Sequence, residues 1–283
     1  MRVEDYSDIV ARALAEDLGD RGDLTTEATV APGTRAEAVV VARSGGVVAG
    51  LEVARQVFAT VDADVGFEGQ CEDGDRVAPG TILAKVGGPA GSILTAERTA
   101  LNLLARMSGV ASATARLVEA VQGTGARITD TRKTMPGLRA LDKYAVTVGG
   151  GVNHRIGLYD QVMIKDNHIV AAGGIVAAVA AVREAYGPSV KVTVEVEDLD
   201  QLAVVFGTDA NRVLLDNMSL ETLRRAVEMV GEAMETEASG GVTIDTVRAI
   251  AETGVDYISV GWITHSAPQM DVALDFLSPE VHR

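Results

Sequence analysis

The sequence predicts an α/β protein in which an N-terminal α+β open sandwich domain precedes an incomplete α/β barrel of six or seven strands. After residue 125, short apolar runs alternate with helical patterns, which is typical of right-handed βαβ units and a parallel sheet. Most of these runs are continuously apolar, as expected of strands that are buried on both faces. Before residue 110, β-like runs alternate with turns instead, which indicates a separate α+β module.

The N-terminal domain is expected to span residues 1–109. One helical pattern, Leu51–Val61, lies among its strand-like runs, and Asp73-Gly74 is a hairpin signal between the last two runs. The runs are Ala36–Arg43, Val47–Ala49, Val65–Cys71 and Thr81–Val86. A long helical pattern begins near Ser92 and leaves Arg98 at the edge of its apolar stripe or beyond.

The barrel is expected to span residues 110–265, with Ala145–Val148 as a seventh candidate strand. The other candidate strands are Ala126–Asp130, Gln161–Ile164, Val190–Glu195, Val213–Leu215, Glu235–Ala238 and Tyr257–Val260. The helical patterns between the later ones are Ile175–Ala185, Leu199–Phe206, Leu220–Val230 and Thr243–Ala251. A barrel is favoured over an open doubly wound sheet, although it has fewer strands than the usual eight.

Composition restricts the possible partners. A net charge of −15 argues against nucleic acid and anionic membranes, because both bind to basic surfaces. Cys71 is the only cysteine, so an intrachain disulfide and a cysteine zinc cluster are excluded. The N-terminal residues lack the apolar stretch of a signal peptide, and no run is long enough to span a bilayer. We therefore expect a cytoplasmic protein.

One stretch, residues 128–168, is locally basic within this acidic chain. It holds three of the five lysines together with several arginines and histidines. These are Lys133, Lys143, Lys165, Arg132, Arg139, Arg155, His154 and His168. Arg offers a planar fork for carboxylate or phosphate, whereas Lys offers a compact point charge. The mixture predicts a small ligand with several anionic groups.

Polar residues follow most candidate strands, at the end of a barrel where ligands bind. Ser239-Gly240 and Gly261 follow the last two strands, which is the usual phosphate site of barrels. Glu195 and Asp216 end neighbouring strands and could bind Mg²⁺ through water, hold a ribose or act in acid–base chemistry. They could also only neutralise nearby cations. His154 is interpreted as a hydrogen-bonding or anion-binding residue and not as a metal ligand.

The chain resembles the quinolinate phosphoribosyltransferase family, which are type II phosphoribosyltransferases. The matching motifs run in order over nearly the whole sequence. They are Glu16-Asp17-Leu18-Gly19, Gly22-Asp23-Leu24-Thr25, Ala96-Glu97-Arg98, Asp130-Thr131-Arg132-Lys133-Thr134, Pro136-Gly137-Leu138-Arg139, Asn153-His154-Arg155, Gly157-Leu158, Lys165-Asp166-Asn167-His168, Glu195-Val196-Glu197, Leu215-Asp216-Asn217 and Glu237-Ala238-Ser239-Gly240-Gly241. Met135 stands where many relatives have a second threonine.

The resemblance implies transfer of phosphoribosyl from phosphoribosyl pyrophosphate to quinolinate, with Mg²⁺ escorting the diphosphate. The products would be nicotinate mononucleotide, pyrophosphate and CO₂, in NAD biosynthesis. It also implies a homodimer in which Arg98 reaches the partner's site, and a C-terminal tail, residues 266–283, that packs on the first domain.

Site roles follow from that chemistry. Catalytic roles are expected for Lys133, Lys165, Glu195 and Asp216. Substrate contacts are expected from Arg98, Thr131, Arg132, His154, Arg155, Lys165, Ser239, Gly240 and Gly261. Three rivals stay open: a molybdenum-system relative with another anionic acceptor, a Schiff-base lyase that uses Lys133 or Lys165, and a non-catalytic phosphometabolite sensor.

Overall fold

The computed structural model describes residues 6–277, which form two compact units. The first unit comprises Met1–Ala113, Met135–Gly150 and Ser266–Arg283, and the second comprises Thr114–Thr134 and Gly151–His265. Residues 135–150 thus group with the first unit, whereas the sequence placed them in the barrel domain. Residues 278–283 of the predicted tail lie outside the described residues.

An antiparallel sheet with strand order β12-β1-β5-β3 forms the centre of the first unit. Its strands are β1 (Arg35–Ala42), β3 (Gly66–Gly69), β5 (Ile82–Pro89) and β12 (Val272–Phe276). A small ribbon pairs β2 (Gly46–Val47) with β4 (Arg76–Val77). The helices are α1 (Ser7–Leu18), α2 (Leu24–Thr29), α3 (Leu51–Val61), α4 (Ala90–Ala120, which continues into the second unit) and α5 (Arg139–Val148).

Helix α3 has the predicted bounds, and the turn after β3 explains its start. Gly50 precedes the helix in a left-handed conformation, and its own side chain supplies no cap. The Asp73 carboxylate instead accepts hydrogen bonds from the backbone N–H groups of Gly50, at 2.9 Å, and Leu51, at 3.1 Å. The acidic turn read from the sequence as a hairpin signal therefore also caps a helix.

The described part of the C-terminal tail forms an edge strand of the first unit. Strand β12 runs antiparallel to β1, with Ala38 opposite Phe276 and Ala42 opposite Val272. Arg43 and Asp275 form an exposed ion pair at 2.7 Å across this edge. The strand pairing satisfies backbone groups that β1 would otherwise leave open to another chain.

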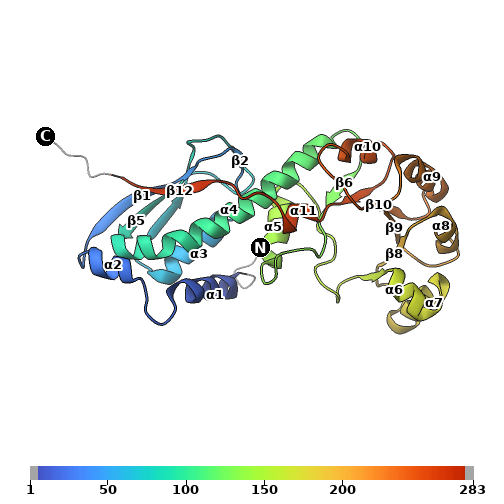
Figure 1. Cartoon of the computed structure of the whole chain (residues 1–283), viewed down its shortest axis with the longest axis horizontal. Helices are drawn as coiled ribbons and strands as arrows, with labels where there is room; N and C mark the ends of the chain where they lie inside the picture. Colours follow the sequence, from blue (N-terminus) through green and yellow to red (C-terminus); the bar gives the residue numbers. More distant parts are fainter. Residues whose placement is uncertain (1–5, 278–283) are drawn as a thin grey trace. The chain divides into compact units, whose positions relative to one another are not determined.

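Six parallel strands form the sheet of the second unit, in the order β6-β11-β10-β9-β8-β7. They are β6 (Arg127–Thr129), β7 (Val162–Ile164), β8 (Val192–Val196), β9 (Arg212–Asp216), β10 (Glu235–Ser239) and β11 (Tyr257–Ser259). Helices α6 (Asp166–Ala172), α7 (Ile175–Tyr186), α8 (Leu199–Val205), α9 (Leu220–Val230), α10 (Val247–Ala251) and α11 (Trp262–His265) connect or follow them. Figure 1 shows α8, α9 and α10 side by side along this sheet.

The predicted six strands are present, but the seventh is wrong. Ala145–Val148 lies within α5, where Leu141, Ala145 and Val146 are buried. Leu141 and Ala145 are four residues apart and share one helical face, and a four-residue apolar run cannot separate a strand from a helix by itself. Strands β6 and β7 end the sheet order without pairing to each other, so the barrel is incomplete, as predicted.

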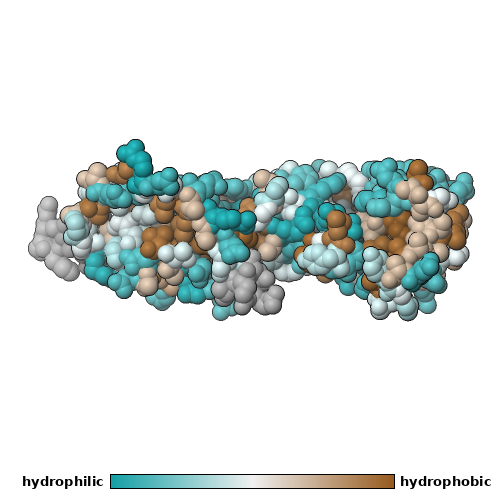
Figure 2. Space-filling view, turned by 90° about the horizontal axis from the view of Figure 1, so that it is seen from below, coloured by the Kyte–Doolittle hydropathy of each residue, from teal (hydrophilic) through white to brown (hydrophobic). Residues whose placement is uncertain are grey.

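Within the described residues, no single helix is long and apolar enough to cross a membrane. Helices α6 and α7, which are bent by 85° relative to each other, reach that length and apolar composition only when they are taken together. Hydrophilic residues cover much of the face in Figure 2, and separate apolar patches interrupt them. The most exposed large apolar side chains include Tyr159, Val170 and Leu158.

Candidate active site

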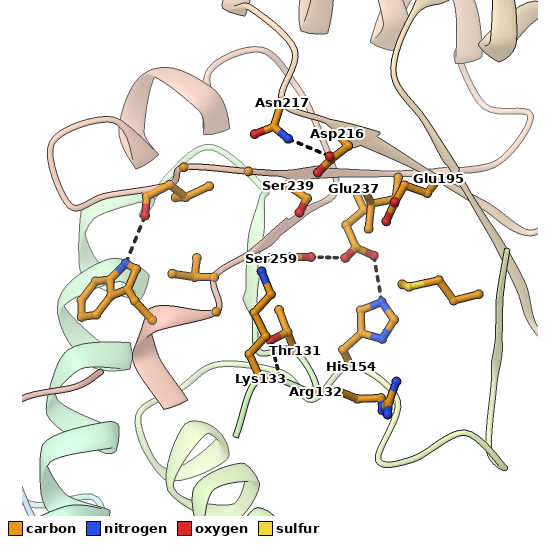
Figure 3. Close-up of a pocket in the computed structure, with 18 of the residues that line it drawn as sticks. Thr131, Arg132, Lys133, His154, Glu195, Asp216, Asn217, Glu237, Ser239 and Ser259 are labelled. Carbon is orange, nitrogen blue, oxygen red and sulfur yellow. Dashed lines mark hydrogen bonds and ion pairs between the residues drawn. The ribbon is translucent and has the colours of Figure 1, made fainter. Parts of the chain in front are cut away.

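A pocket of about 730 Å³ opens where the strands of the second unit end, and residues of that unit alone line it. Figure 3 shows how side chains from several strands converge on it. Its lining combines cationic, acidic and glycine-rich segments: Thr131, Arg132, Lys133, His154, Arg155, Met163, Lys165, Glu195, Leu214, Asp216, Asn217, Glu237, Ser239, Gly240, Gly241, Val242, Ser259, Val260, Gly261, Trp262 and His265. Every predicted site residue except Arg98 is among them.

Arg98 and part of the basic stretch lie elsewhere. Arg98 is on α4 in the first unit, its side chain 65% exposed and 3.9 Å from Glu97. Arg139 and Lys143 lie on α5, and the Lys143 side chain is buried there. His168 accepts a hydrogen bond from the Lys165 backbone at 3.0 Å and so orders the start of α6. The sequence therefore overestimated how many cations of this stretch gather at one place.

The cations that do gather form one wall. Burial, followed by the nearby charge of Arg132, lowers the pKa of Arg155 from its ordinary value. An arginine stays charged under all relevant conditions, so Arg155 places a largely buried positive charge near that of Arg132. The Arg155 guanidinium donates to the Gln161 carbonyl at 3.3 Å, which fixes its direction. Such a wall attracts carboxylates or phosphates.

Lys133 is held by its backbone, which leaves its side chain directed into the pocket in Figure 3. The Lys133 N–H donates to the Thr131 hydroxyl at 3.0 Å, and the Thr264 hydroxyl donates to the Lys133 carbonyl at 2.9 Å. A Cβ added at Gly261 would lie 3.1 Å from the Lys133 Cδ. Glycine at 261 therefore leaves room for the aliphatic stem of Lys133.

His154 is buried, and its two ring nitrogens both face protein groups. Nδ1 accepts a hydrogen bond from the Arg155 backbone N–H at 2.7 Å, and Nε2 lies 3.3 Å from a Glu237 carboxylate oxygen. The Arg155 N–H therefore fixes the ring at Nδ1 and turns Nε2 toward the Glu237 carboxylate. This geometry orients His154 within the pocket lining, and its predicted contact with substrate stays a prediction.

Glu237 is a fully buried carboxylate at the floor of the pocket. Its carboxylate lies 3.3 Å from His154 Nε2 and accepts hydrogen bonds from the Ser259 hydroxyl and, at 2.9 Å, from Arg212. Burial alone raises its pKa, but His154, Ser259 and Arg212 outweigh burial and hold the pKa of Glu237 below its ordinary value. Glu237 is therefore an ionised, fully bonded anion beneath the cationic wall.

Glu195 and Asp216 lie on the neighbouring strands β8 and β9. Glu195 is paired with the Lys165 ammonium, and Asp216 accepts a hydrogen bond from the Asn217 amide at 2.7 Å. No group of three or more His, Cys, Asp or Glu side chains within residues 6–277 could hold a metal. Two carboxylates fit Mg²⁺ when waters and substrate phosphates supply its other oxygens.

The glycine turn after β10 is the candidate phosphate cradle. Gly240 and Gly241 have φ values of +100° and +58°, which glycine adopts without strain. The helix predicted from Thr243 begins at Val247 as the five-residue α10, because Thr243 and Thr246 form a hydrogen-bonded turn before it. The backbone of the turn, and not a helix N-terminus, therefore offers the N–H donors for an anion.

Five of the lining residues that were not assigned from the sequence have side chains that can hydrogen-bond: Asn217, Glu237, Ser259, Trp262 and His265. Asn217 and Glu237 lie beside predicted residues in motifs that were recognised, so the strand-end position was a usable signal for both. Trp262 donates to the Val242 carbonyl at 3.1 Å and so joins the loops after β10 and β11. Nothing in the local sequence indicates that contact.

The fold and the site define an α/β enzyme with a pocket at the C-terminal end of a parallel sheet, and the lining of that pocket suits a polyanionic small molecule. Comparisons with known proteins agree. Models of the N-terminal and C-terminal domains of quinolinate phosphoribosyl transferase match residues 23–108 and 110–275. The chain belongs to this family, and the resemblance seen in the sequence is confirmed.

Individual relatives match over most of their length. A nicotinate-nucleotide pyrophosphorylase [carboxylating] of Mycobacterium leprae is 46% identical, with 95% of this chain and 96% of that protein covered. A chloroplastic enzyme of the same name from Oryza sativa subsp. japonica is 44% identical, with 95% and 77% covered. The crystal structure of a nicotinate-nucleotide pyrophosphorylase from Ehrlichia chaffeensis superposes with a TM-score of 0.93 at 39% identity and covers 96% of this chain and 98% of that one.

Proposed function

We propose that the chain transfers phosphoribosyl from phosphoribosyl pyrophosphate to quinolinate with decarboxylation, giving nicotinate mononucleotide, pyrophosphate and CO₂ in NAD biosynthesis. One observation carries the proposal: a single pocket joins a cationic wall to two carboxylates and a glycine turn. A dicarboxylic acid fits the first part, and a phosphorylated sugar fits the second. Family membership supports the same assignment.

Quinolinate carries two adjacent carboxylates, which suit the cationic wall. We assign them to Arg132, Lys133 and Arg155, with arginine forks and a lysine point charge around the ring. The burial of Arg155 beside the charge of Arg132 supports this, because a bound dianion would offset both positive charges.

Phosphoribosyl pyrophosphate is assigned to the opposite wall. Ser239, Gly240 and Gly261 cradle the 5′-phosphate, and Glu195 and Asp216 hold the ribose hydroxyls and offset positive charge that develops at the anomeric carbon. Mg²⁺ held by Glu195, Asp216 and the diphosphate, in part through water, would neutralise the departing pyrophosphate. Lys133 and Lys165 would balance the remaining charge.

The reaction balances with these groups. The ring nitrogen donates its lone pair to the anomeric carbon as the carbon–oxygen bond to pyrophosphate breaks. The alkylated ring is then cationic at nitrogen, so it accepts the electron pair left when the 2-carboxylate departs as CO₂. A proton then takes the place of that carboxylate. The protein supplies position and charge, as in other phosphoribosyl chemistry without covalent intermediates.

The oligomer and the location stay proposals. We propose a homodimer in which Arg98 completes the partner's pocket, and the exposure of Arg98 on α4 supports an intermolecular role. A cytoplasmic location also stays a prediction, and the name of the rice relative places that protein in the chloroplast.

Product formation tests the assignment. Purified protein with phosphoribosyl pyrophosphate, Mg²⁺ and quinolinate should form nicotinate mononucleotide, whereas nicotinate, which lacks the 2-carboxylate, should react far more slowly. Equal rates with both acids would contradict the proposed clamp. No product from quinolinate would favour a relative that acts on another anionic acceptor. Borohydride trapping of substrate on Lys133 or Lys165 would favour a Schiff-base lyase, and binding of phosphoribosyl pyrophosphate without turnover would favour a sensor.

A further inference from the structure

The segment just after β9 has an unusual backbone. Within residues 6–277, Asn217 is the only residue other than glycine with a positive φ, at 54°. Asparagine tolerates this conformation better than most residues but still pays for it, and such positions gather at functional sites. Asn217 follows Asp216 directly and lines the pocket.

Two hydrogen bonds fix Asn217 between the two strand ends. Its backbone N–H donates to the Ser239 carbonyl at 2.9 Å, and its side-chain NH₂ donates to the Asp216 carboxylate at 2.7 Å. The amide nitrogen must face Asp216, because an ionised carboxylate can only accept. The amide oxygen consequently points toward Gly240, where an added Cβ would lie 2.1 Å from it. Figure 3 shows the Asn217–Asp216 contact above the pocket.

These contacts explain the conformation. A negative φ at residue 217 would turn the side-chain amide away from Asp216 while the backbone N–H stays bonded to Ser239. Glycine at position 240 leaves space for the Asn217 amide oxygen, which a Cβ would occupy. The same glycine allows the positive φ of the turn. One residue therefore ties the carboxylate wall to the candidate phosphate cradle.

We propose that Asn217 is a positioning residue that holds the Asp216 carboxylate toward phosphoribosyl pyrophosphate and keeps it in register with the Ser239–Gly241 turn. This inference rests on the proposed function, which places the sugar diphosphate at that wall. Groups that orient a carboxylate ligand from behind commonly change affinity or activity about 10- to 100-fold when removed.

Two substitutions separate positioning from folding. Asn217→Gly accepts the positive φ without strain and removes only the amide, so the fold should survive. Asn217→Asp keeps the shape but places an acceptor against Asp216. The matched control is Asn211→Gly, at the opposite end of β9 and outside the pocket lining. The Asn211 amide oxygen accepts hydrogen bonds from the Val192 N–H at 2.8 Å and from Arg183 at 3.0 Å.

Calorimetric binding of phosphoribosyl pyrophosphate with Mg²⁺ is the measurement, beside KM for each substrate. Both Asn217 variants should weaken that binding about 10- to 100-fold, with KM for quinolinate little changed. Asn211→Gly should lower the melting temperature and leave binding intact. Wild-type binding by Asn217→Gly, or equal weakening by Asn211→Gly, would overturn the positioning role. Turnover of quinolinate by the unsubstituted enzyme is a separate measurement, and its absence would refute the proposed reaction. The difference in phosphoribosyl pyrophosphate affinity between the Asn217 and Asn211 variants would still decide the role of Asn217.

Coupling to Gly240 gives an independent check. Gly240→Ala introduces both backbone strain and overlap with the Asn217 amide, and Asn217→Gly removes the overlap with the side chain but not the 3.0 Å approach to the backbone nitrogen of residue 217. The loss of affinity in the double variant should therefore be smaller than the sum of the single losses in free energy. Additive losses would show that Gly240 and Asn217 act separately and would contradict the proposed junction.

Discussion

At the scale of single residues, the pocket is organised by groups that lie behind its surface. Glu237 holds His154 through Nε2, and Asn217 holds Asp216 through its amide. The sequence predicted the residues that reach the pocket, because charged residues at strand ends are visible in the chain order. It did not predict the groups that orient them, because those roles depend on φ and on contacts between strands distant in sequence.

Lys133 is the residue whose loss should affect turnover most. Its backbone is fixed by Thr131 and Thr264, so Lys133→Ala should leave the fold intact. Removing its charge from both substrates should lower kcat/KM by at least about a hundredfold, which corresponds to roughly 2.7 kcal/mol. Steady-state kinetics with circular dichroism as the control measures this. Near-normal turnover in folded protein would remove Lys133 from the reaction.

Glu237 and Glu235 form a matched pair on β10, because both bind Arg212. Glu237→Gln alters the group that faces His154 in the pocket. Glu235→Gln changes only the first residue of β10, which does not line the pocket. We expect Glu237→Gln to raise KM for quinolinate several-fold more than Glu235→Gln. Equal effects of the two substitutions on KM would mean that Glu237, like Glu235, acts only by binding Arg212 and does not orient His154.

The pH dependence of stability gives a second test of Glu237. Its pKa is held below the ordinary value of 4.5, so its charge stabilises the fold above that pH, and this contribution is lost as the pH falls through the lower pKa of the folded state. Breaking such a buried network costs about 3–5 kcal/mol near neutral pH. Denaturation of wild type and Glu237→Gln should show that difference at pH 7 and a smaller one in acid. A constant difference across this range would contradict ionised Glu237.

At the scale of elements, strands were easier to predict than short helices. Continuous apolar runs between turn residues identified most of the six barrel strands, because burial on both faces leaves that pattern, whereas β10 carries two glutamates. Helix α5 was missed since Ala145–Val148 alone fits either structure, and α6 was missed because its first residues, Asp166-Asn167-His168, resemble a strand-end loop. In both places packing decided the structure where local pattern was ambiguous.

Asp73 tests how one side chain starts an element. Asp73→Ala removes the acceptor for two N–H groups at the start of α3 and for the Tyr144 hydroxyl, which donates at 2.8 Å. The cap alone should cost about 0.5–2 kcal/mol, and the lost Tyr144 bond adds to it. Urea denaturation measures the loss, with Asp64→Ala on the same unit as a control. Equal stability of the two variants would contradict the capping role.

At the scale of the whole molecule, the pocket and Arg98 belong to different units of the chain. The structure holds one chain, so the expected reach of Arg98 into a partner's pocket depends on assembly. Sequence comparison supports the family, and the exposure of Arg98 supports a role outside its own unit.

Complementation tests that assembly. Arg98→Ala and Lys133→Ala proteins should each be nearly inactive, and a mixture that exchanges subunits should regain up to about a quarter of wild-type activity, since a random hybrid dimer rebuilds one intact site in half of the dimers. The control is each single variant taken alone through the same subunit-exchange procedure. No recovery after exchange, shown by tagged subunits, would place Arg98 in its own chain's function.

The central claim is that one pocket brings a doubly acidic pyridine and a sugar diphosphate together. A single-turnover experiment with quinolinate labelled in the 2-carboxylate tests it most directly, by measuring labelled CO₂ and pyrophosphate from the same sample. We predict that both are released in equal amounts, and only when both substrates and Mg²⁺ are present. Release of pyrophosphate without labelled CO₂, or of neither, would contradict the account.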